Sequence, residues 1–189
     1  MRCAVDVAPL RAEPDDASEQ VTQVLLGEPV RVEERRAGWA RVVTAYDYPG
    51  WVRAESLEGG DGELVADLDA TAHSPIDVAR LYLGAPYLWG GMTDRGIDCS
   101  GLVHMAYRRL GRLVPRDAGQ QEEAGRETDV PRAGDLVTYG EPGLAADHIA
   151  FWVGDGRILH STGRDGGIGV VEEDEPEDLH ARRRKIVRL

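Results

Sequence analysis

A cysteine at the start of a predicted helix is the residue best placed for chemistry in this chain. Cys99 follows a glycine-containing loop, and the apolar residues after it recur at helical spacing until Gly111. A thiol in the first turn of a helix lies near the positive end of the helix dipole and near free backbone N–H groups, and both favour the reactive thiolate. The same N–H groups could stabilise a developing oxyanion, so we interpret Cys99 as a candidate nucleophile.

Two histidines in the second half of the chain could serve this cysteine. His148 opens a predicted strand, and His160 lies on the next strand, after the turn Gly154-Asp155-Gly156. Residues at similar distances from a tight turn lie side by side in an antiparallel hairpin, so we expect the two imidazoles to be neighbours. The spacing predicts a relay in which Cys99 attacks, His148 accepts and returns the proton, and His160 orients the ring of His148.

Other interpretations of these residues are open on the sequence. Cys99 could be a small buried core residue, which is a common fate of a free cysteine. Cys99, His148 and His160 are also zinc-ligand types, although no closely spaced pair of ligands accompanies them. Ser100 could be a rival nucleophile with His148 and Asp147, but neighbouring residues on a strand point to opposite faces. We expect the remaining histidines to be surface residues: His73, His104 and His180.

Composition and charge exclude several classes of partner. The 189 residues are 42% hydrophobic and 30% charged, as in ordinary globular proteins. A formal net charge of −12 argues against nucleic acid and anionic wall polymers as partners. No apolar run approaches the roughly 18 residues that would span a bilayer, so we expect no membrane partner. The first six residues lack the apolar segment of a secretory signal. If Met1 is the natural start, we therefore expect a cytoplasmic protein.

The pattern of elements predicts an α+β protein built from two domains. Residues 1–58 contain short strands punctuated by glycine and proline, which is typical of a small β-barrel, with Trp39 and Trp51 in its core. An acidic, glycine-bearing linker is expected at residues 59–73. In residues 74–189, helices from Pro75 to Leu83 and from Cys99 precede antiparallel strands. These strands are expected at residues 135–139, 148–153, 157–162, 168–172 and 185–189.

Six motifs occur in order in the second domain, and together they resemble the NlpC/p60 family of papain-like cysteine peptidases, which cut bacterial cell-wall peptides. The motifs are Tyr-x-Trp-Gly-Gly, Gly-Ile-Asp-Cys-Ser-Gly-Leu, Pro-Arg-Asp-Ala-x-Gln-Gln, Gly-Asp-Leu-Val, Asp-His-Ile-Ala and Ile-Leu-His-Ser. The resemblance covers roughly residues 75–189. It implies that Cys99 is the nucleophile, His148 the base and His160 the orienting residue. It also places Tyr87 near the oxyanion. Such a reaction requires no metal and no other cofactor.

The first domain resembles a bacterial SH3 domain. It contains Pro-Leu-Arg, Thr-Gln followed by Gly-Glu, Gly-Trp and Tyr-x-Gly-Trp-Val in that order. This domain followed by an NlpC/p60 domain is similar to the γ-D-glutamyl-L-diamino acid endopeptidases of peptidoglycan recycling. In those enzymes the SH3 domain closes one end of the groove, so that a peptide with a free N-terminal L-alanine fits. The resemblance thus implies cleavage of the bond between D-Glu and the diamino acid in the murein peptide L-Ala-γ-D-Glu-diamino acid.

Further site residues are implied by the same resemblance. Asp98 and Tyr48 match positions that would hold the ammonium group of the substrate, and Glu19 matches more loosely. The carboxylate of D-Glu is expected near Ser100, Arg116 and Asp117, where Arg116 is the natural cation. A site built around an ammonium group rejects substrates that leave its charge unpaired, so acetylating the amine should be costly. Asp98 could instead be only a helix N-cap, and Tyr48 could simply pack between the domains.

We therefore expect a cytoplasmic cysteine peptidase acting on small wall-derived peptides. One alternative is a hydrolase of intact peptidoglycan outside the cell, which a signal peptide upstream of Met1 would favour. Another alternative is a binding module that keeps the groove but not the chemistry. The sequence does not identify the diamino acid that is accepted.

Overall fold

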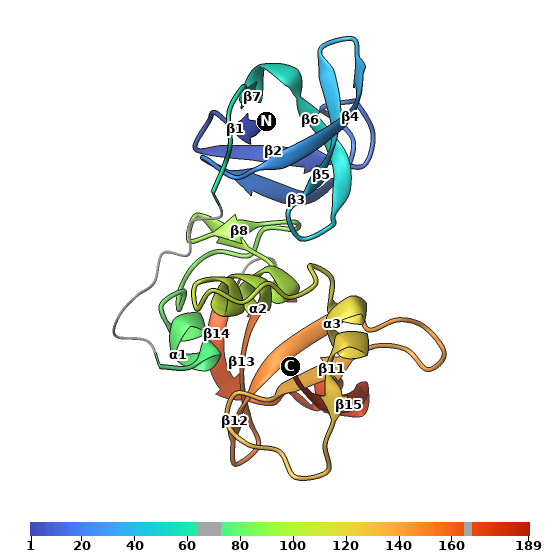
Figure 1. Cartoon of the computed structure of the whole chain (residues 1–189). Coiled ribbons are helices and arrows are strands. Elements are labelled where there is room, and N and C mark those ends of the chain that lie inside the picture. The colour runs from blue at the N-terminus through green and yellow to red at the C-terminus, as the bar shows by residue number, and fades with distance from the viewer. Residues whose placement is uncertain (64–72, 165–167) are drawn as a thin grey trace. The chain divides into compact units, whose positions relative to one another are not determined.

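The protein consists of two compact units, Met1–Ala66 and Asp67–Leu189, in the computed structural model shown in Figure 1. The model describes residues 1–63, 73–164 and 168–189. Residues 64–72 of the expected linker lie outside this part of the chain. An all-β unit is followed by a unit of helices and antiparallel strands, which confirms the α+β class.

The N-terminal unit is a five-stranded antiparallel sheet with the strand order β3-β2-β6-β5-β4. Its core holds Cys3, Leu10, Val24, Val42 and Val52, all fully buried. As expected, both tryptophans of this unit are buried too. The strands of the sheet are β2 (Val7–Arg11), β3 (Gln20–Leu25), β4 (Val30–Arg36), β5 (Trp39–Thr44) and β6 (Pro49–Arg53). A small second sheet pairs β1 (Arg2–Cys3) with β7 (Leu57–Glu58), and the 3-10 helix Ala54–Ser56 precedes β7.

The C-terminal unit is built on a six-stranded antiparallel sheet with the order β10-β15-β11-β12-β13-β14. Its strands are β10 (Arg126–Glu127), β11 (Leu136–Tyr139), β12 (His148–Gly154), β13 (Arg157–Thr162), β14 (Gly169–Asp174) and β15 (Arg183–Arg188). The five expected strands are present, with ends displaced by no more than two residues. The turn between β12 and β13 has positive φ at Asp155 and Gly156, as a tight hairpin requires. A separate hairpin pairs β8 (Met92–Thr93) with β9 (Gly96–Ile97).

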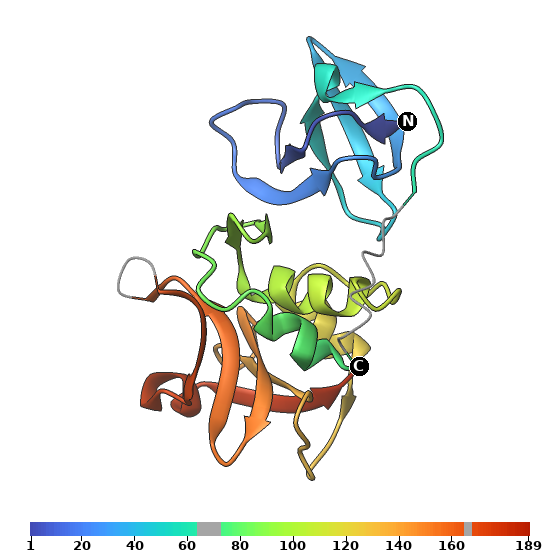
Figure 2. The ribbon, with the colours of Figure 1, turned by 90° about the vertical axis from the view of Figure 1, so that its left-hand side faces the viewer.

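Four helices lie in this unit: α1 (Pro75–Arg80), α2 (Cys99–Arg108), α3 (Ala118–Ala124) and α4 (Glu177–Ala181). Figures 1 and 2 show α1 and α2 against one face of the sheet. On that face the ring of Phe151 stacks on Tyr107 of α2, with centroids 6.5 Å apart. The other face carries Ile158 and its neighbours, which pack against Leu179 of α4. The sheet therefore separates a layer containing α2 from a layer containing α4.

Two expectations about the helices were wrong in part. The helix that begins at Pro75 ends at Arg80 instead of Leu83, and Ser74 caps its N-terminus by accepting from the Asp77 amide. His104 was expected at the surface, but it is fully buried, and its Nδ1 lies 2.8 Å from the carbonyl oxygen of Val114. The reason is that α2 contacts α1, α3, β8 and two strands, so all of its residues are buried and no polar face remains. None of the described helices is long and apolar enough to cross a bilayer.

Candidate functional site

The N-terminus of α2 is packed tightly against the loop that precedes it. A Cβ atom on Gly101 would lie 2.3 Å from the carbonyl oxygen of Gly91, and one on Gly91 would lie 2.3 Å from that of Gly96. Both distances are far below van der Waals contact, so the backbone can approach this closely only because these residues are glycines. The Gly-Gly and Cys-Ser-Gly motifs therefore fix the start of the helix against its loop.

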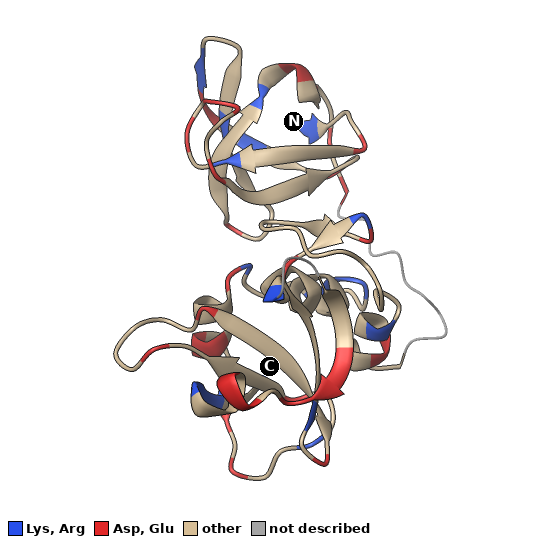
Figure 3. Ribbon diagram, turned by 180° about the vertical axis from the view of Figure 1, so that it is seen from behind, with Lys and Arg blue, Asp and Glu red and all other residues tan. Residues whose placement is uncertain are grey.

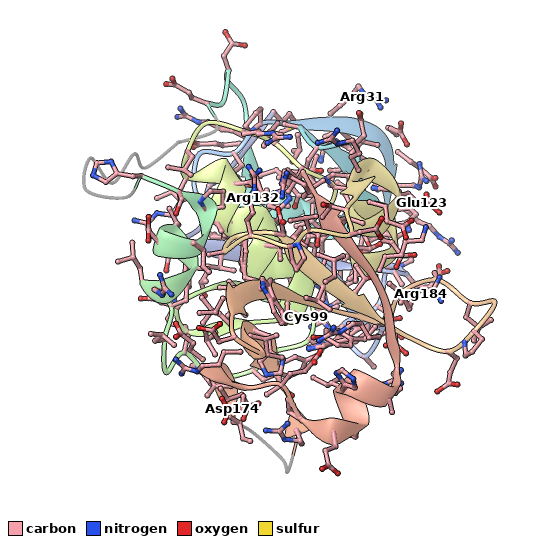
Figure 4. The ribbon with its side chains drawn as sticks, turned by 90° about the horizontal axis from the view of Figure 1, so that it is seen from below. Arg31, Cys99, Glu123, Arg132, Asp174 and Arg184 are labelled. Atoms are coloured by element: carbon pink, nitrogen blue, oxygen red, sulfur yellow. The ribbon has the colours of Figure 1, made fainter. Side chains whose placement is uncertain are left out.

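Cys99 is the first residue of α2, and Figure 4 shows it at the start of that helix. Its side chain is buried, and its sulfur has backbone hydrogen bonds with Ser100 and with Ile149, the residue after His148. The helix start thus lies directly beside the start of β12. Burial nevertheless raises the pKa of the thiol to about 12, and the negative charge of Asp98 acts in the same direction. Desolvation at this position therefore opposes the expected preference for the thiolate and favours the neutral thiol.

His148 and His160 are joined by a direct hydrogen bond, as their positions on the hairpin predicted. Nε2 of His148 lies 2.8 Å from Nδ1 of His160, and the two rings meet edge to face at 75°. The ring of His148 also packs against Tyr139, with a centroid distance of 5.7 Å. Burial lowers the pKa of His148 to about 3, and the neighbouring His160 adds to this effect. His148 is half-buried and precedes Ile149, the residue that contacts the sulfur of Cys99, so a neutral imidazole at this position is a candidate to accept the thiol proton.

The hydrogen bonds extend beyond His160 to two charged residues, Glu173 and Arg164, which the sequence analysis did not single out. Nε2 of His160 lies 3.0 Å from Oε1 of Glu173 on β14. Arg164 donates to both carboxylate oxygens of Glu173, at 2.8 and 3.0 Å. The pKa of His160 is lowered by burial, while its hydrogen bond with Glu173 acts in the opposite direction. No sequence signal marked Glu173, because its position opposite His160 follows from the pairing of β13 with β14.

Asp98, Ser100 and Arg116 form a buried cluster next to the nucleophile. Arg116 donates to both oxygens of Asp98, at 3.0 and 2.7 Å, and to Oγ of Ser100 at 2.9 Å. Asp98 also accepts from the Gly101 amide at 2.6 Å and is thus the N-cap of α2. The structure therefore brings these three expected site residues together, but it pairs them with one another. Ser100 is held by this cluster, while Asp147 is bound to Arg182 at 2.5 Å.

The remaining expected residues lie in different surroundings. Tyr87 is half-buried near Cys99, and burial raises the pKa of its phenol; a thiolate at Cys99 would act in the same direction. Asp117 is the N-cap residue of α3, and its amide donates to Gln120 at 3.4 Å. Tyr48 and Glu19 belong to the N-terminal unit, where Tyr48 packs on the core and Glu19 is exposed. The roles expected for Tyr48 and Glu19 in substrate binding remain predictions.

A pocket of about 230 Å³ lies beside the histidine pair. Its wall includes the ring of His148 together with Asp147, Arg164, Asp178, Leu179 and Arg182. The wall thus carries both positively and negatively charged side chains beside His148, the candidate base. Across residues 1–63, 73–164 and 168–189, no group of three or more His, Cys, Asp and Glu side chains is placed to hold a metal ion.

Comparisons with known proteins agree with the motifs. Residues 84–181 match the model of the NlpC/P60 family, and residues 10–57 match that of the bacterial dipeptidyl-peptidase Sh3 domain. A gamma-D-glutamyl-L-lysine dipeptidyl-peptidase of Bacillus subtilis is 40% identical over 105 residues, which are 53% of this chain and 36% of the relative. Dipeptidyl-peptidase 6 of Lysinibacillus sphaericus is 31% identical over 143 residues, 73% of this chain and 51% of the relative. The chain thus spans about a third to a half of the length of these curated relatives.

A solved structure of an NlpC/P60 family protein from Bacillus cereus aligns with 99% of this chain and with 62% of its own chain. The TM-score is 0.55 and the sequence identity 22%, so the likeness concerns the fold. Its extent indicates that both units have counterparts in that protein.

Proposed function

Because the chain belongs to the NlpC/P60 family, we propose that it is a cysteine peptidase that hydrolyses peptides derived from peptidoglycan. The bond cut is the γ-D-glutamyl bond to a diamino acid, in peptides that begin with a free L-alanine. The names of two relatives, gamma-D-glutamyl-L-lysine dipeptidyl-peptidases, support this choice of bond. The observation that carries the proposal is the 2.8 Å hydrogen bond between His148 and His160 next to the strand residue that contacts Cys99.

The chemistry follows from the resting state of these groups. Sγ of Cys99 attacks the γ-carbonyl carbon of D-Glu, and its proton passes to the imidazole of His148. The backbone N–H groups at the start of α2 and the hydroxyl of Tyr87 can donate to the oxyanion. Because burial raises the pKa of Tyr87, its hydroxyl keeps the proton that this role requires. His148 then returns the proton to the leaving amine, and water releases the peptide acid from the thioester.

The pocket beside His148 supports an amino acid with charges of both signs as the leaving group. The leaving amine receives its proton from His148, so the rest of that amino acid must lie close to the same ring. Arg182 in the wall could bind a carboxylate, and Asp178 could bind an ammonium group. A diamino acid carries both kinds of charge.

The proposal is tested with a panel of synthetic peptides. L-Ala-γ-D-Glu-L-Lys and L-Ala-γ-D-Glu-meso-diaminopimelate are offered beside their N-acetylated forms and beside an isomer with an α-linked glutamate. Release of L-Ala-D-Glu from the free-amine, γ-linked peptides is expected, with loss of most activity on acetylation. Cleavage of the α-linked isomer at an equal rate would contradict the choice of bond.

Two alternative functions correspond to other outcomes of this test. Activity on intact peptidoglycan with none on the small peptides would favour a wall hydrolase. Binding of the peptides without cleavage would favour a binding module. The cytoplasmic location also stays a prediction, which fractionation of cells expressing the natural gene would test.

A further inference from the structure

We propose that Glu173, held by Arg164, is a positioning residue that determines which ring nitrogens of His160 and His148 carry protons. The inference rests on the proposed function only in taking His148 as the base. Nothing in the family match or in the motifs points to Glu173. The argument starts from its place in the sheet.

Glu173 reaches the histidine pair from the face of the sheet opposite α2. On β14 it stands across from Ile158 of β13, and His160 lies two residues further along β13. Side chains two residues apart share a face, and Ile158 packs against Leu179 of α4. Glu173 and His160 are thus on the α4 side, while Cys99 starts the helix on the other side. Figure 3 shows the acidic residues at the end of β14 and in α4.

The hydrogen bonds leave one arrangement of protons in the neutral pair. A carboxylate only accepts, so the contact at 3.0 Å requires a proton on Nε2 of His160. A neutral imidazole has a single N–H, so Nδ1 of His160 must accept. Its partner at 2.8 Å, Nε2 of His148, therefore donates. This leaves Nδ1 of His148 without a proton, as the atom able to take one from a thiol.

Arg164 makes this arrangement rigid. Its guanidinium donates to both oxygens of Glu173, which holds the carboxylate in one orientation. The ring of His160 is fully buried, so water does not compete for Nε2. Asp178 also acts on His160, Arg182 on His148 and Arg164 on both rings, while Asp147 lines the same pocket as His148. Glu173 stands out because it lies within hydrogen-bond distance of a histidine ring.

The carboxylate also matters while the proton moves. When His148 accepts the thiol proton, it becomes a cation that still donates through Nε2 to His160. The negative charge of Glu173, one ring further away, stabilises that cation, whereas Arg164 alone would oppose it. Replacing Glu173 by an apolar residue would leave the donors of Arg164 facing Nε2 of His160. They favour the opposite tautomers, with a proton on Nδ1 of His148 and no free base.

Nitrogen-15 NMR of the histidines in the wild-type protein tests the assigned positions of the ring protons, and it needs no variant and no peptide. We expect His160 and His148 both to be protonated at Nε2 and unprotonated at Nδ1. A proton on Nδ1 of either ring in the neutral protein would overturn the inference. If no peptide is cleaved but these tautomers are found, the proposed function fails while this inference stands.

Kinetics of variants test whether Glu173 supports catalysis. Glu173→Met should lower kcat about tenfold to a hundredfold with little change in KM, and should shift the NMR signals to the other tautomer. Glu173→Gln keeps an acceptor and should lose less activity. The matched control is Glu172→Met on the same strand. Glu172 binds Arg80 and Arg157 instead of the histidines, and its loss should change kcat less than twofold.

A double variant separates positioning from general damage to the fold. Adding Arg164→Met to Glu173→Met removes the misplaced donor, so part of the lost kcat should return. A double variant that is less active than the single variant, or a Glu173→Met protein with wild-type kcat and tautomers, would overturn the inference.

Discussion

Replacing Arg116 by methionine is expected to destabilise the C-terminal unit by about 3–5 kcal/mol, the usual cost of removing one partner from a buried ion pair. The side chain of Arg116 is 1% exposed and that of Asp98 is 9% exposed. Arg116 donates to both oxygens of Asp98, to Ser100 and to the Gly91 carbonyl at 3.3 Å. Without it, the buried carboxylate keeps the amides of Gly90 and Gly101 and the hydroxyl of Ser100 as donors, but no positive charge. For a unit of this size, the loss corresponds to a fall in melting temperature of about 12–20 °C.

The assay follows the helical circular dichroism signal during heat or urea unfolding, because helices α1 to α4 all lie in the C-terminal unit. Arg157→Met is the control, since Arg157 is 45% exposed and its ion pairs should contribute less than about 1 kcal/mol. Adding Asp98→Asn to Arg116→Met removes the stranded charge and should recover part of the loss. A loss below about 1 kcal/mol in Arg116→Met, or no recovery in the double variant, would refute this reasoning.

Three other changes have defined outcomes. Gly101→Ala places a Cβ 2.3 Å from a carbonyl and should destabilise by at least about 2 kcal/mol in urea unfolding, whereas Gly59→Ala, with open space, should be near neutral. His104→Gln should flatten the pH dependence of stability. Burial lowers the pKa of His104 from 6.5 to about 3. Between these two pH values the unfolded chain protonates this histidine while the folded protein does not. The free energy of unfolding therefore falls as the pH drops from about 6.5 to about 3, by about 1.4 kcal/mol per pH unit. Unchanged slopes would contradict this assignment. Alkylation of Cys99 should be slow at neutral pH and accelerate toward its raised pKa, and fast, pH-independent alkylation from about pH 5 would contradict a neutral resting pair.

The parts of the site that depend on local pattern were predictable from the sequence. The helix start at Cys99, its N-cap Asp98 and the hairpin between β12 and β13 each follow from residue types within a few positions. Hairpin geometry alone predicted that His148 and His160 are neighbours. The hydrogen bond between their rings confirms this prediction.

The parts that depend on packing were not predictable. His104 lies off the apolar stripe of its helix, yet neighbours on every side bury it. The helix dipole favours a thiolate at Cys99, but the sequence does not show how much burial opposes it. Glu173 meets His160 only through the register of β14. Asp98 and Arg116 were assigned to different ends of a substrate, and the structure pairs them within the protein.

The central claim is that Cys99, served by His148, cleaves a γ-D-glutamyl peptide. The most direct measurement is mass-spectrometric digestion of L-Ala-γ-D-Glu-L-Lys by the wild-type protein, by Cys99→Ala and by His148→Gln. The account predicts release of L-Ala-D-Glu and lysine by the wild type, none by Cys99→Ala, and a rate at least about a hundredfold lower for His148→Gln. Undiminished cleavage by Cys99→Ala would contradict it.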